Sequence, residues 1–269
     1  MLRFLRERRR RELRQRPAPE EWRAIISHNL PFFDRLDAPD REELLGHVKV
    51  FLDEKRFEGC SGLELTNEIK VTIATQACLL LLHRKTDYYP RLVTILVYPS
   101  GYVVEQERHL EGPVWEGGRE GRLGETASAM GSMVLAWDAA KSGARDPSDG
   151  TNLVLHEFAH QLDFEDSVAD GMPAISSRGE KLSWAETMKM EFAGLRAAGE
   201  AGIPTLLNTY GASNPAEFFA VATEAFFERP LALRRHHPRL YQELQRFYRQ
   251  DPALYSSEPA AGAATGHSA

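Results

Sequence analysis

Residues 151–163 have the sequence TNLVLHEFAHQLD, which contains the pattern H-E-x-x-H. Its histidines, His156 and His160, are four positions apart, so on a helix they project from one face and can bind one zinc ion through imidazole nitrogens. Glu157 follows the first histidine, where it can take a proton from a water molecule at the metal and later pass it to a leaving amine. The stretch therefore predicts a zinc-dependent peptidase with one Zn2+ per chain and peptides as substrates.

The surroundings of the pattern favour a metal site over a chance match on an ordinary amphipathic helix. Leucine, valine, phenylalanine and alanine fill most other positions between residues 153 and 162, so the helix is expected to be mostly buried. Burial of two histidines and a glutamate without partners would cost on the order of several kcal/mol, whereas a metal ion satisfies all three. We therefore expect a bound metal.

A catalytic zinc needs a third protein ligand and one open position for water, and the sequence offers two candidates. Asp166 stands where proteases of the H-E-x-x-H-x-x-G-x-x-H/D type carry that ligand, but Asp163 occupies the position at which they need glycine for a sharp turn. Glu217 lies in a helix predicted to start at residues 213–215 and to continue as AEFFAVATEAFF. The absent glycine disfavours Asp166, but the residues alone leave the choice of Glu217 open.

Two further carboxylates could support the metal ligands. Glu224 lies two turns after Glu217 on the same, otherwise apolar, helix face, which is expected to pack against the H-E-x-x-H helix. It could orient a ligand histidine or simply line the core. Asp163 could accept a hydrogen bond from a ligand imidazole or cap its own helix.

The composition of the 269 residues indicates a soluble globular protein. A formal net charge of -6 gives no general attraction to nucleic acid or anionic lipid, and no apolar run approaches the roughly 18 residues of a membrane span. Cys60 and Cys78 form no disulfide framework, which fits a reducing cytoplasm. We expect a cytoplasmic protein that does not bind nucleic acid directly.

A dense arginine run, MLRFLRERRRRELRQR, occupies residues 1–16 and is followed by two prolines. A secretory signal needs a continuous apolar region after its charged start, whereas charged residues break up the apolar residues of this run. We therefore expect that it is not a secretory signal. We expect residues 1–19 to form a basic, solvated arm or a short helix appended to the domain. An alternative gives the stretch from Arg6 to Arg16 a role in binding anionic lipid or nucleic acid, with a steep loss of binding in salt.

The hydrophobic patterns predict an α+β, mainly helical metallopeptidase domain over residues 20–255, as one unit or two packed lobes, and a disordered tail at 256–269. Helices are expected at 20–26, after a cap at Asp40, and at 66–82 in the core. Strands are expected at 92–99, 102–104 and 133–137. A surface loop is expected at 112–131 and a polar linker at 141–150. The strands are expected to form a small β-sheet beside the helices.

These motifs together resemble the Mlc titration factor A family, bacterial zinc metallopeptidases whose catalytic lobe is related to anthrax lethal factor. The resemblance covers most of the chain, and its last two blocks are highly specific in their order and spacing. It is carried by FLDEKRFEG (51–59), IATQACLLLL (73–82), VYPSGY (97–102), VLAW (134–137), LVLHEFAHQLD (153–163) and YGASNPAEFFAVATEAFF (210–227). A zincin-like fold is therefore expected.

The resemblance also implies roles for individual residues. The family's ligand histidines and general base fall on His156, His160 and Glu157. Its third zinc ligand falls on Glu217 and its oxyanion-stabilising tyrosine on Tyr210. Spacing alone would make that tyrosine an ordinary turn residue, but a phenol hydroxyl near the zinc could donate a hydrogen bond to the oxygen of the tetrahedral intermediate.

The segment between residues 102 and 131 departs from the family pattern. Some members have an additional upstream histidine near the metal, but His109 does not fall at the matching position and Glu116 lies nearer to it. We therefore do not count His109 as a ligand, and the basis for a metal-masking resting state is missing.

The resemblance further implies a cytoplasmic enzyme that cleaves short peptides, with aminopeptidase-like activity, and that binds Mlc, a repressor of the glucose system. An alternative from another class is a regulatory protein that sequesters a transcription factor, with structural zinc and incidental turnover. A fourth protein ligand that closes the metal site would favour this alternative. Replacement of Glu157 by glutamine separates the two, because it should abolish hydrolysis and leave metal and partner binding intact.

Overall fold

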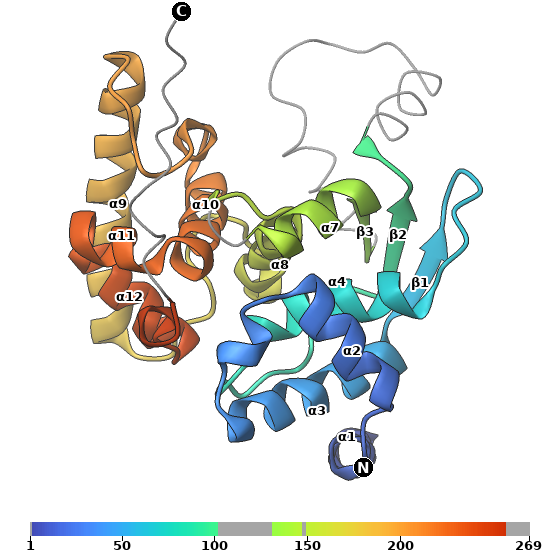
Figure 1. Ribbon diagram of the computed structural model, residues 1–269. Coiled ribbons are helices and arrows are strands. Elements are labelled where there is room, and N and C mark those ends of the chain that lie inside the picture. The colour runs from blue at the N-terminus through green and yellow to red at the C-terminus, as the bar shows by residue number, and fades with distance from the viewer. Residues whose placement is uncertain (1, 102–130, 147–148, 257–269) are drawn as a thin grey trace, which may run out of the picture.

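The computed structural model describes residues 2–101, 131–146 and 149–256, and it is mainly helical with one small sheet (Figure 1). Its helices are α1 (Leu2–Gln15), α2 (Glu20–Asn29), α3 (Ala38–Glu54), α4 (Asn67–Leu79), α7 (Trp137–Arg145), α8 (Leu153–Asp163), α9 (Arg178–Glu200), α10 (Pro215–Glu228), α11 (Pro230–His236) and α12 (Pro238–Tyr248). Helix α8 lies between the sheet with α1 to α4 on one side and α9 to α12 on the other. The α+β, mainly helical prediction is confirmed.

As far as the chain is described, the sheet has three parallel strands in the order β1 (Arg56–Gly59), β2 (Thr94–Tyr98) and β3 (Ser132–Ala136). Phe57 is level with Ile95, and Ile95 is level with Met133. Strand β2 alternates between buried and half-buried side chains, as expected of a strand with one face on the core. The expected strands at 92–99 and 133–137 are therefore confirmed, while the one at 102–104 and the loop at 112–131 fall almost wholly outside the described residues.

Helix α4 forms the centre of the N-terminal half. Thr66 caps it by accepting a hydrogen bond from the backbone N–H of Ile69, and its side chains are buried on nearly all sides. This confirms the core helix expected at 66–82, with its last residues continuing as a turn rather than as helix. Because α4 connects β1 to β2, it also supplies the crossover that parallel neighbours require.

Two local predictions need correction. The polar linker expected at 141–150 is helical as far as Arg145, because Ala140, Gly143 and Ala144 give α7 a small apolar face that is buried. The cap of α3 is Asp37, whose carboxylate accepts the backbone N–H of Asp40, so the helix begins one turn earlier than expected.

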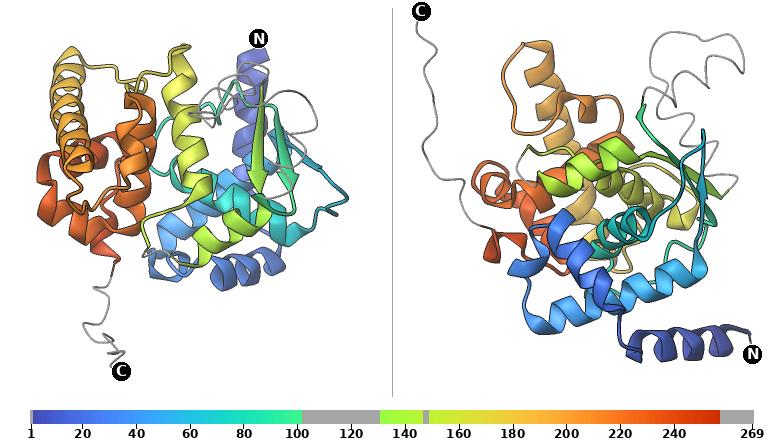
Figure 2. Two further views of the ribbon diagram at one scale, coloured as in Figure 1. Left: turned by 90° about the horizontal axis from the view of Figure 1, so that it is seen from above. Right: turned by 45° about the vertical axis from the view of Figure 1, so that its right-hand side comes forward.

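The arginine-rich segment forms helix α1, which packs along α3 at the outer edge of the N-terminal half (Figures 1 and 2). Arg10 is only 1% exposed, and its guanidinium bonds both carboxylate oxygens of Glu54, at 2.7 and 2.8 Å, and Asp87 at 2.6 Å. Its planar group also lies over the ring of Tyr88, 4.8 Å from the centroid. The expected solvation is thus wrong for the inner face of this helix, while Phe4 on the outer face is 71% exposed.

The helices after residue 177 hold α10 in place. Trp184 of α9 packs edge-on against Phe219 of α10, with ring centroids 5.6 Å apart, and against Phe247 of α12 at 5.4 Å. In the described part of the chain, four short 3-10 turns connect the larger elements: Phe33–Arg35 (η1), Phe164–Asp166 (η2), Thr209–Ala212 (η3) and Pro252–Leu254 (η4). The buried side chains of both halves join in one hydrophobic cluster, so α8 and α10 meet inside a continuous core.

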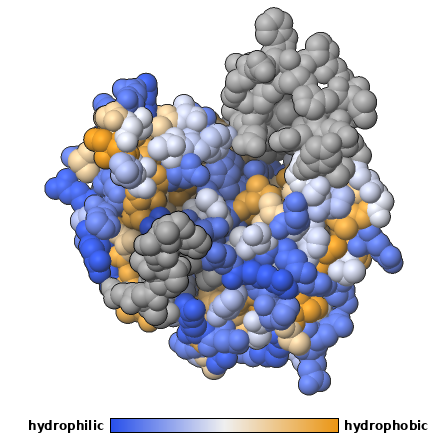
Figure 3. Space-filling view, turned by 45° about the horizontal axis from the view of Figure 1, so that its top comes forward, coloured by the Kyte–Doolittle hydropathy of each residue, from blue (hydrophilic) through white to orange (hydrophobic). Residues whose placement is uncertain are grey.

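Within the described ranges, the chain contains no helix that is long and apolar enough to cross a membrane. Hydrophilic residues dominate the face shown in Figure 3, and the hydrophobic ones form small separate patches there.

Candidate metal centre

Helix α8 presents His156, Glu157 and His160 along one side and buries its opposite side. Asn152 caps the helix by accepting the backbone N–H of Leu155 at 3.0 Å. Apolar residues at positions 154, 155, 158, 159 and 162 fix the helix in the core. The polar stripe is half-buried, with the side chains of His156 and His160 14% and 21% exposed. The burial expected from the sequence therefore holds for the helix, and its functional stripe faces outward from the core.

Helix α10 brings Glu217 to the two histidines. Asn214 caps α10 by accepting the backbone N–H of Glu217 at 3.0 Å, which places this glutamate in the first turn. Its buried carboxylate lies with Oε2 2.9 Å from His156 Nε2 and 3.4 Å from His160 Nε2. The two imidazole Nε2 atoms are 3.2 Å apart. Two imidazoles and one carboxylate thus converge on one point from two helices.

This donor set fits a metal ion. The ligand-type atoms of His156, His160 and Glu217 all lie within 4.8 Å of one another. The lone pairs of two imidazole nitrogens and a carboxylate oxygen this close together call for a cation between them. Two histidines and one glutamate are a ligand set found in catalytic zinc sites, and they leave the fourth position open for water. The residues present can therefore hold zinc.

The electrostatics of the group agree with a cation site. Burial by itself would lower the pKa of His156, but its hydrogen bonds to Glu217 and Glu224 outweigh burial and raise this pKa to about 10. Burial would raise the pKa of Glu217, but hydrogen bonds with His156 and His160 lower it to about 2. The raised pKa of His156 and the lowered pKa of Glu217 have the same cause: the carboxylates around the imidazoles stabilise a positive charge at this site.

Glu224 orients the first histidine. Its Oε1 lies 2.7 Å from His156 Nδ1, and its Oε2 accepts the backbone N–H of Asn152. A carboxylate on Nδ1 keeps a proton there and leaves Nε2 free to act as a ligand. Of the two roles that the sequence left open for Glu224, the contacts match the orienting one.

Asp163 and Asp166 do not belong to this donor set. Asp163 is fully buried, but its Oδ2 accepts the backbone N–H of Gly171 at 2.9 Å, so it fastens the chain after α8. Burial raises the pKa of Asp163 to about 6. Asp166 is exposed in η2 and accepts the backbone N–H of Val168. The structure thus brings Glu217 to the histidines and leaves Asp166 away from them.

Tyr210 lies at the rim of the same site. It belongs to η3, where Asn208 accepts its backbone N–H at 3.0 Å, and its ring centroid is 6.1 Å from that of His156. Tyr210 is 36% exposed, so a bound molecule could reach it. Glu157 is close enough to His156 for its charge to raise the histidine pKa. His109 and Glu116 lie outside the described residues.

A small sheet among helices, with two histidines one turn apart on α8 and a glutamate on α10, agrees with a mainly helical α+β metallopeptidase domain. A sequence profile described as Glucose-regulated metallo-peptidase M90 matches residues 4–249. The chain belongs to this metallopeptidase family, whose members use a metal ion.

Relatives along nearly the whole chain agree with this assignment. An uncharacterized protein of Synechocystis sp. is 39% identical over 246 residues, which cover 91% of this chain and 90% of that protein. Proteins named Mlc titration factor A from Yersinia pestis and Yersinia pseudotuberculosis are each 30% identical over 244 residues, covering 86% of this chain and 85% of theirs. The resemblance noted in the sequence is therefore confirmed.

Proposed function

We propose that the protein is a zinc-dependent peptidase whose metal ligands are His156, His160 and Glu217. The observation that carries this proposal is the convergence of their ligand atoms, with Glu157 on the same half-buried stripe of α8. Zinc bound there supplies a Lewis acid for a peptide carbonyl and for the attacking water. A one-zinc site with three protein ligands keeps the open position that catalysis needs.

The chain's own residues then divide the remaining work. Glu157 accepts a proton from the attacking water and delivers it to the leaving amine, which makes it the general base and acid. Tyr210 donates a hydrogen bond to the oxygen that gains negative charge. Glu224 holds the His156 ring at the angle that directs Nε2 inward.

The proposed substrates are short peptides cleaved in an aminopeptidase-like manner, and the proposed location is the cytoplasm. The substrate class follows from the family resemblance. The location follows from the same resemblance together with the absence of a paired-cysteine framework in the sequence. The exposure of Tyr210 and the partial exposure of the two histidines support access for a small flexible peptide.

Metal content and cleavage test this proposal directly. The purified protein is analysed for zinc and incubated with a panel of fluorogenic amino-acid and peptide substrates, before and after treatment with a chelator and re-addition of zinc. We expect about one zinc per chain, and cleavage that is lost with the metal and restored by it. Full zinc occupancy without cleavage of any substrate would contradict the peptidase proposal.

A second candidate is a regulatory one. The relatives named Mlc titration factor A, at 30% identity, favour binding to a repressor of the Mlc type. In this case the protein sequesters a transcription factor and turnover is incidental. Calorimetric titration with such a repressor from the same organism, using wild type and Glu157→Gln, tests it: equal affinity for both proteins is expected, and absence of binding would contradict it.

Tyr210→Phe is expected to lower kcat by roughly 10- to 100-fold with little change in KM. The lost hydroxyl donates chiefly in the transition state, and its partial exposure places the loss below the roughly 10²–10³ that removal of a preorganised oxyanion donor costs. Steady-state kinetics measure it, and unchanged zinc content and Tm serve as controls. An unchanged kcat would return Tyr210 to the role of a turn residue.

A further inference from the structure

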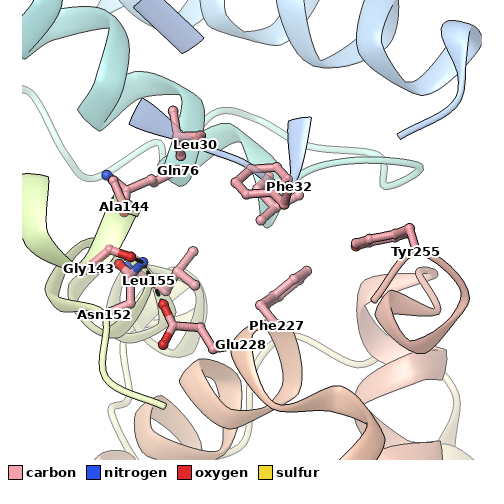
Figure 4. A pocket seen from close by; sticks show the side chains of 11 residues that line it. Leu30, Phe32, Gln76, Gly143, Ala144, Asn152, Leu155, Phe227, Glu228 and Tyr255 are labelled. Atoms are coloured by element: carbon pink, nitrogen blue, oxygen red, sulfur yellow. Dashed lines mark hydrogen bonds between the residues drawn. The ribbon is translucent and has the colours of Figure 1, made fainter. Parts of the chain in front are cut away.

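The cavity drawn in Figure 4 is too small for a substrate. Its volume of about 20 Å3 is enough for one water molecule. Figure 4 shows Tyr255 across the cavity from Asn152 and Glu228, whose side chains are joined by a hydrogen bond of 3.0 Å. The stronger feature that the proposed function leaves unexplained is on the surface, in the basic helix α1.

Helix α1 has an inner and an outer face. The inner face packs along α3 and contains the buried Arg10. A helix turns once in about 3.6 residues, so a second set of residues faces away from Arg10, and all of them are exposed. This outer face consists of Phe4, Leu5, Arg8 and Arg11. Figure 2 shows α1 lying along the outside of the molecule.

The outer face carries two adjacent apolar side chains that the fold does not use. Phe4 is 71% exposed and Leu5 53%. Neither belongs to the hydrophobic core that the described residues form, whereas Leu13 of the same helix packs against it. Aromatic and aliphatic side chains next to arginines on one helix are typical of helices that lie in the interface of a lipid bilayer. The pair is therefore available to an apolar environment outside the chain.

The charge of the chain is unevenly divided. Residues 1–16 contain eight of its 33 basic residues and two of its 39 acidic ones, which gives this segment a net charge of +6. The remainder of the chain therefore has a net charge of -12. An anionic surface attracts the first part and repels the second, so it selects the orientation in which α1 faces it.

The fold uses part of the positive charge of α1 and leaves part of it exposed. Ion pairs with other elements hold three of the arginines: Arg6 with Asp87, Arg9 with Asp53 and Arg10 with Glu54. On the outer face, Arg8 pairs with Glu12 of its own helix, and the two side chains are 69% and 52% exposed, so water screens this pair. Arg11 has no ion pair among the described residues. The guanidinium groups of Arg8 and Arg11 can therefore meet anions from outside.

We propose that the outer face of α1 docks on the surface of an anionic lipid bilayer. Phe4 and Leu5 enter the boundary between headgroups and acyl chains, while Arg8 and Arg11 contact the phosphate groups. Each of these two contributions is weak by itself, but the apolar pair and the basic cluster act on the same face and strengthen each other. Because α1 lies along the outside of the molecule, the helix can lie flat on the bilayer.

The apolar pair favours a bilayer over nucleic acid as the occupant of this face. Both offer phosphate groups to the arginines. Attraction to phosphates does not call for exposed apolar side chains, whereas insertion into a bilayer gains from each one that leaves water. The docking does not involve the metal centre, so it can be measured without any assay of activity.

Sedimentation with lipid vesicles tests this proposal on the full-length, zinc-loaded protein. Vesicles of phosphatidylcholine with one third phosphatidylglycerol are compared with vesicles of phosphatidylcholine alone, at low and at high NaCl. We expect binding to the anionic vesicles at low salt, a steep loss as salt screens the charges, and no binding to the neutral vesicles. Equal binding to both kinds of vesicle, or to neither, would overturn the proposal.

Two double variants locate the contact. Arg8→Gln with Arg11→Gln should weaken binding to the anionic vesicles by roughly 25-fold, because each basic residue near such a surface contributes roughly five-fold. Phe4→Ser with Leu5→Ser should weaken it by roughly tenfold or more, because the wild-type side chains leave water on docking. All four residues are exposed, so both variants should keep the wild-type Tm.

Arg234→Gln with Arg239→Gln is the matched control, since it removes two exposed arginines from α11 and α12 instead of α1. It should bind the anionic vesicles as wild type does. Full binding without Phe4 and Leu5 would contradict docking by insertion, because attraction between charges would then suffice. Tighter binding to a duplex DNA oligonucleotide than to the vesicles would assign the outer face to nucleic acid instead.

Discussion

Glu157→Gln is expected to lose peptide hydrolysis by a factor of roughly 10²–10⁴ while its zinc content stays at the wild-type level. The glutamine has the same size and keeps the half-buried position beside His156 on α8, but its amide cannot take up the proton of the attacking water. The metal ligands are untouched by this change. Single-turnover cleavage of the best fluorogenic substrate, together with elemental analysis, measures both quantities on one preparation.

Glu186→Gln is the matched control for this variant. Glu186 is exposed on α9, so its substitution removes the same charge at a position away from the site. It should cleave as wild type does. Hydrolysis by Glu157→Gln at the wild-type rate would mean that another group accepts the proton. If the wild type binds zinc and a repressor but never cleaves, the regulatory function becomes the better account.

Glu217→Ala is expected to lose both zinc and hydrolysis. Loss of a residue that only hydrogen-bonds a metal ligand lowers metal affinity by roughly 10–100-fold. Loss of Glu217, a direct ligand, should lower it by more. Alanine favours the helix and Asn214 still caps it, so α10 should persist. Zinc content after dialysis and a competition titration with a chromophoric chelator give the change in affinity.

Asp166→Ala provides the comparison for the third ligand. Asp166 is exposed in η2, so this variant should keep wild-type zinc affinity and activity. Zinc retained by Glu217→Ala but lost by Asp166→Ala would exchange the roles of the two residues.

The two histidines could be placed from sequence because four residues in a helix fix their geometry. The third ligand could not, since it comes from another helix and sequence spacing does not determine how two helices pack. The available signals were the Asn-Pro pair at 214 and 215, which sets the start of α10, and the glutamates at 217 and 224 on an apolar face. Buried carboxylates need partners, and both find His156.

Two of the elements that the sequence analysis did not predict have identifiable physical causes. Strand β1 has only four residues, three of them exposed, so it shows no useful periodicity. Helix α7 buries alanine and glycine, which carry too little hydrophobicity to distinguish it from a linker.

The buried guanidinium of Arg10 bears on how the N-terminal segment can be studied. Cutting away residues 2–16, as one would a dispensable basic tail, would strip the counter-charge from Glu54 and uncover a side of α3. Loss of binding to lipid or nucleic acid in a shortened chain would then report damage to the fold as much as missing charge. Substitution of the outward-facing Arg3 and Arg11 leaves Arg10 in place, so it separates a loss of lipid or nucleic-acid binding from damage to the fold.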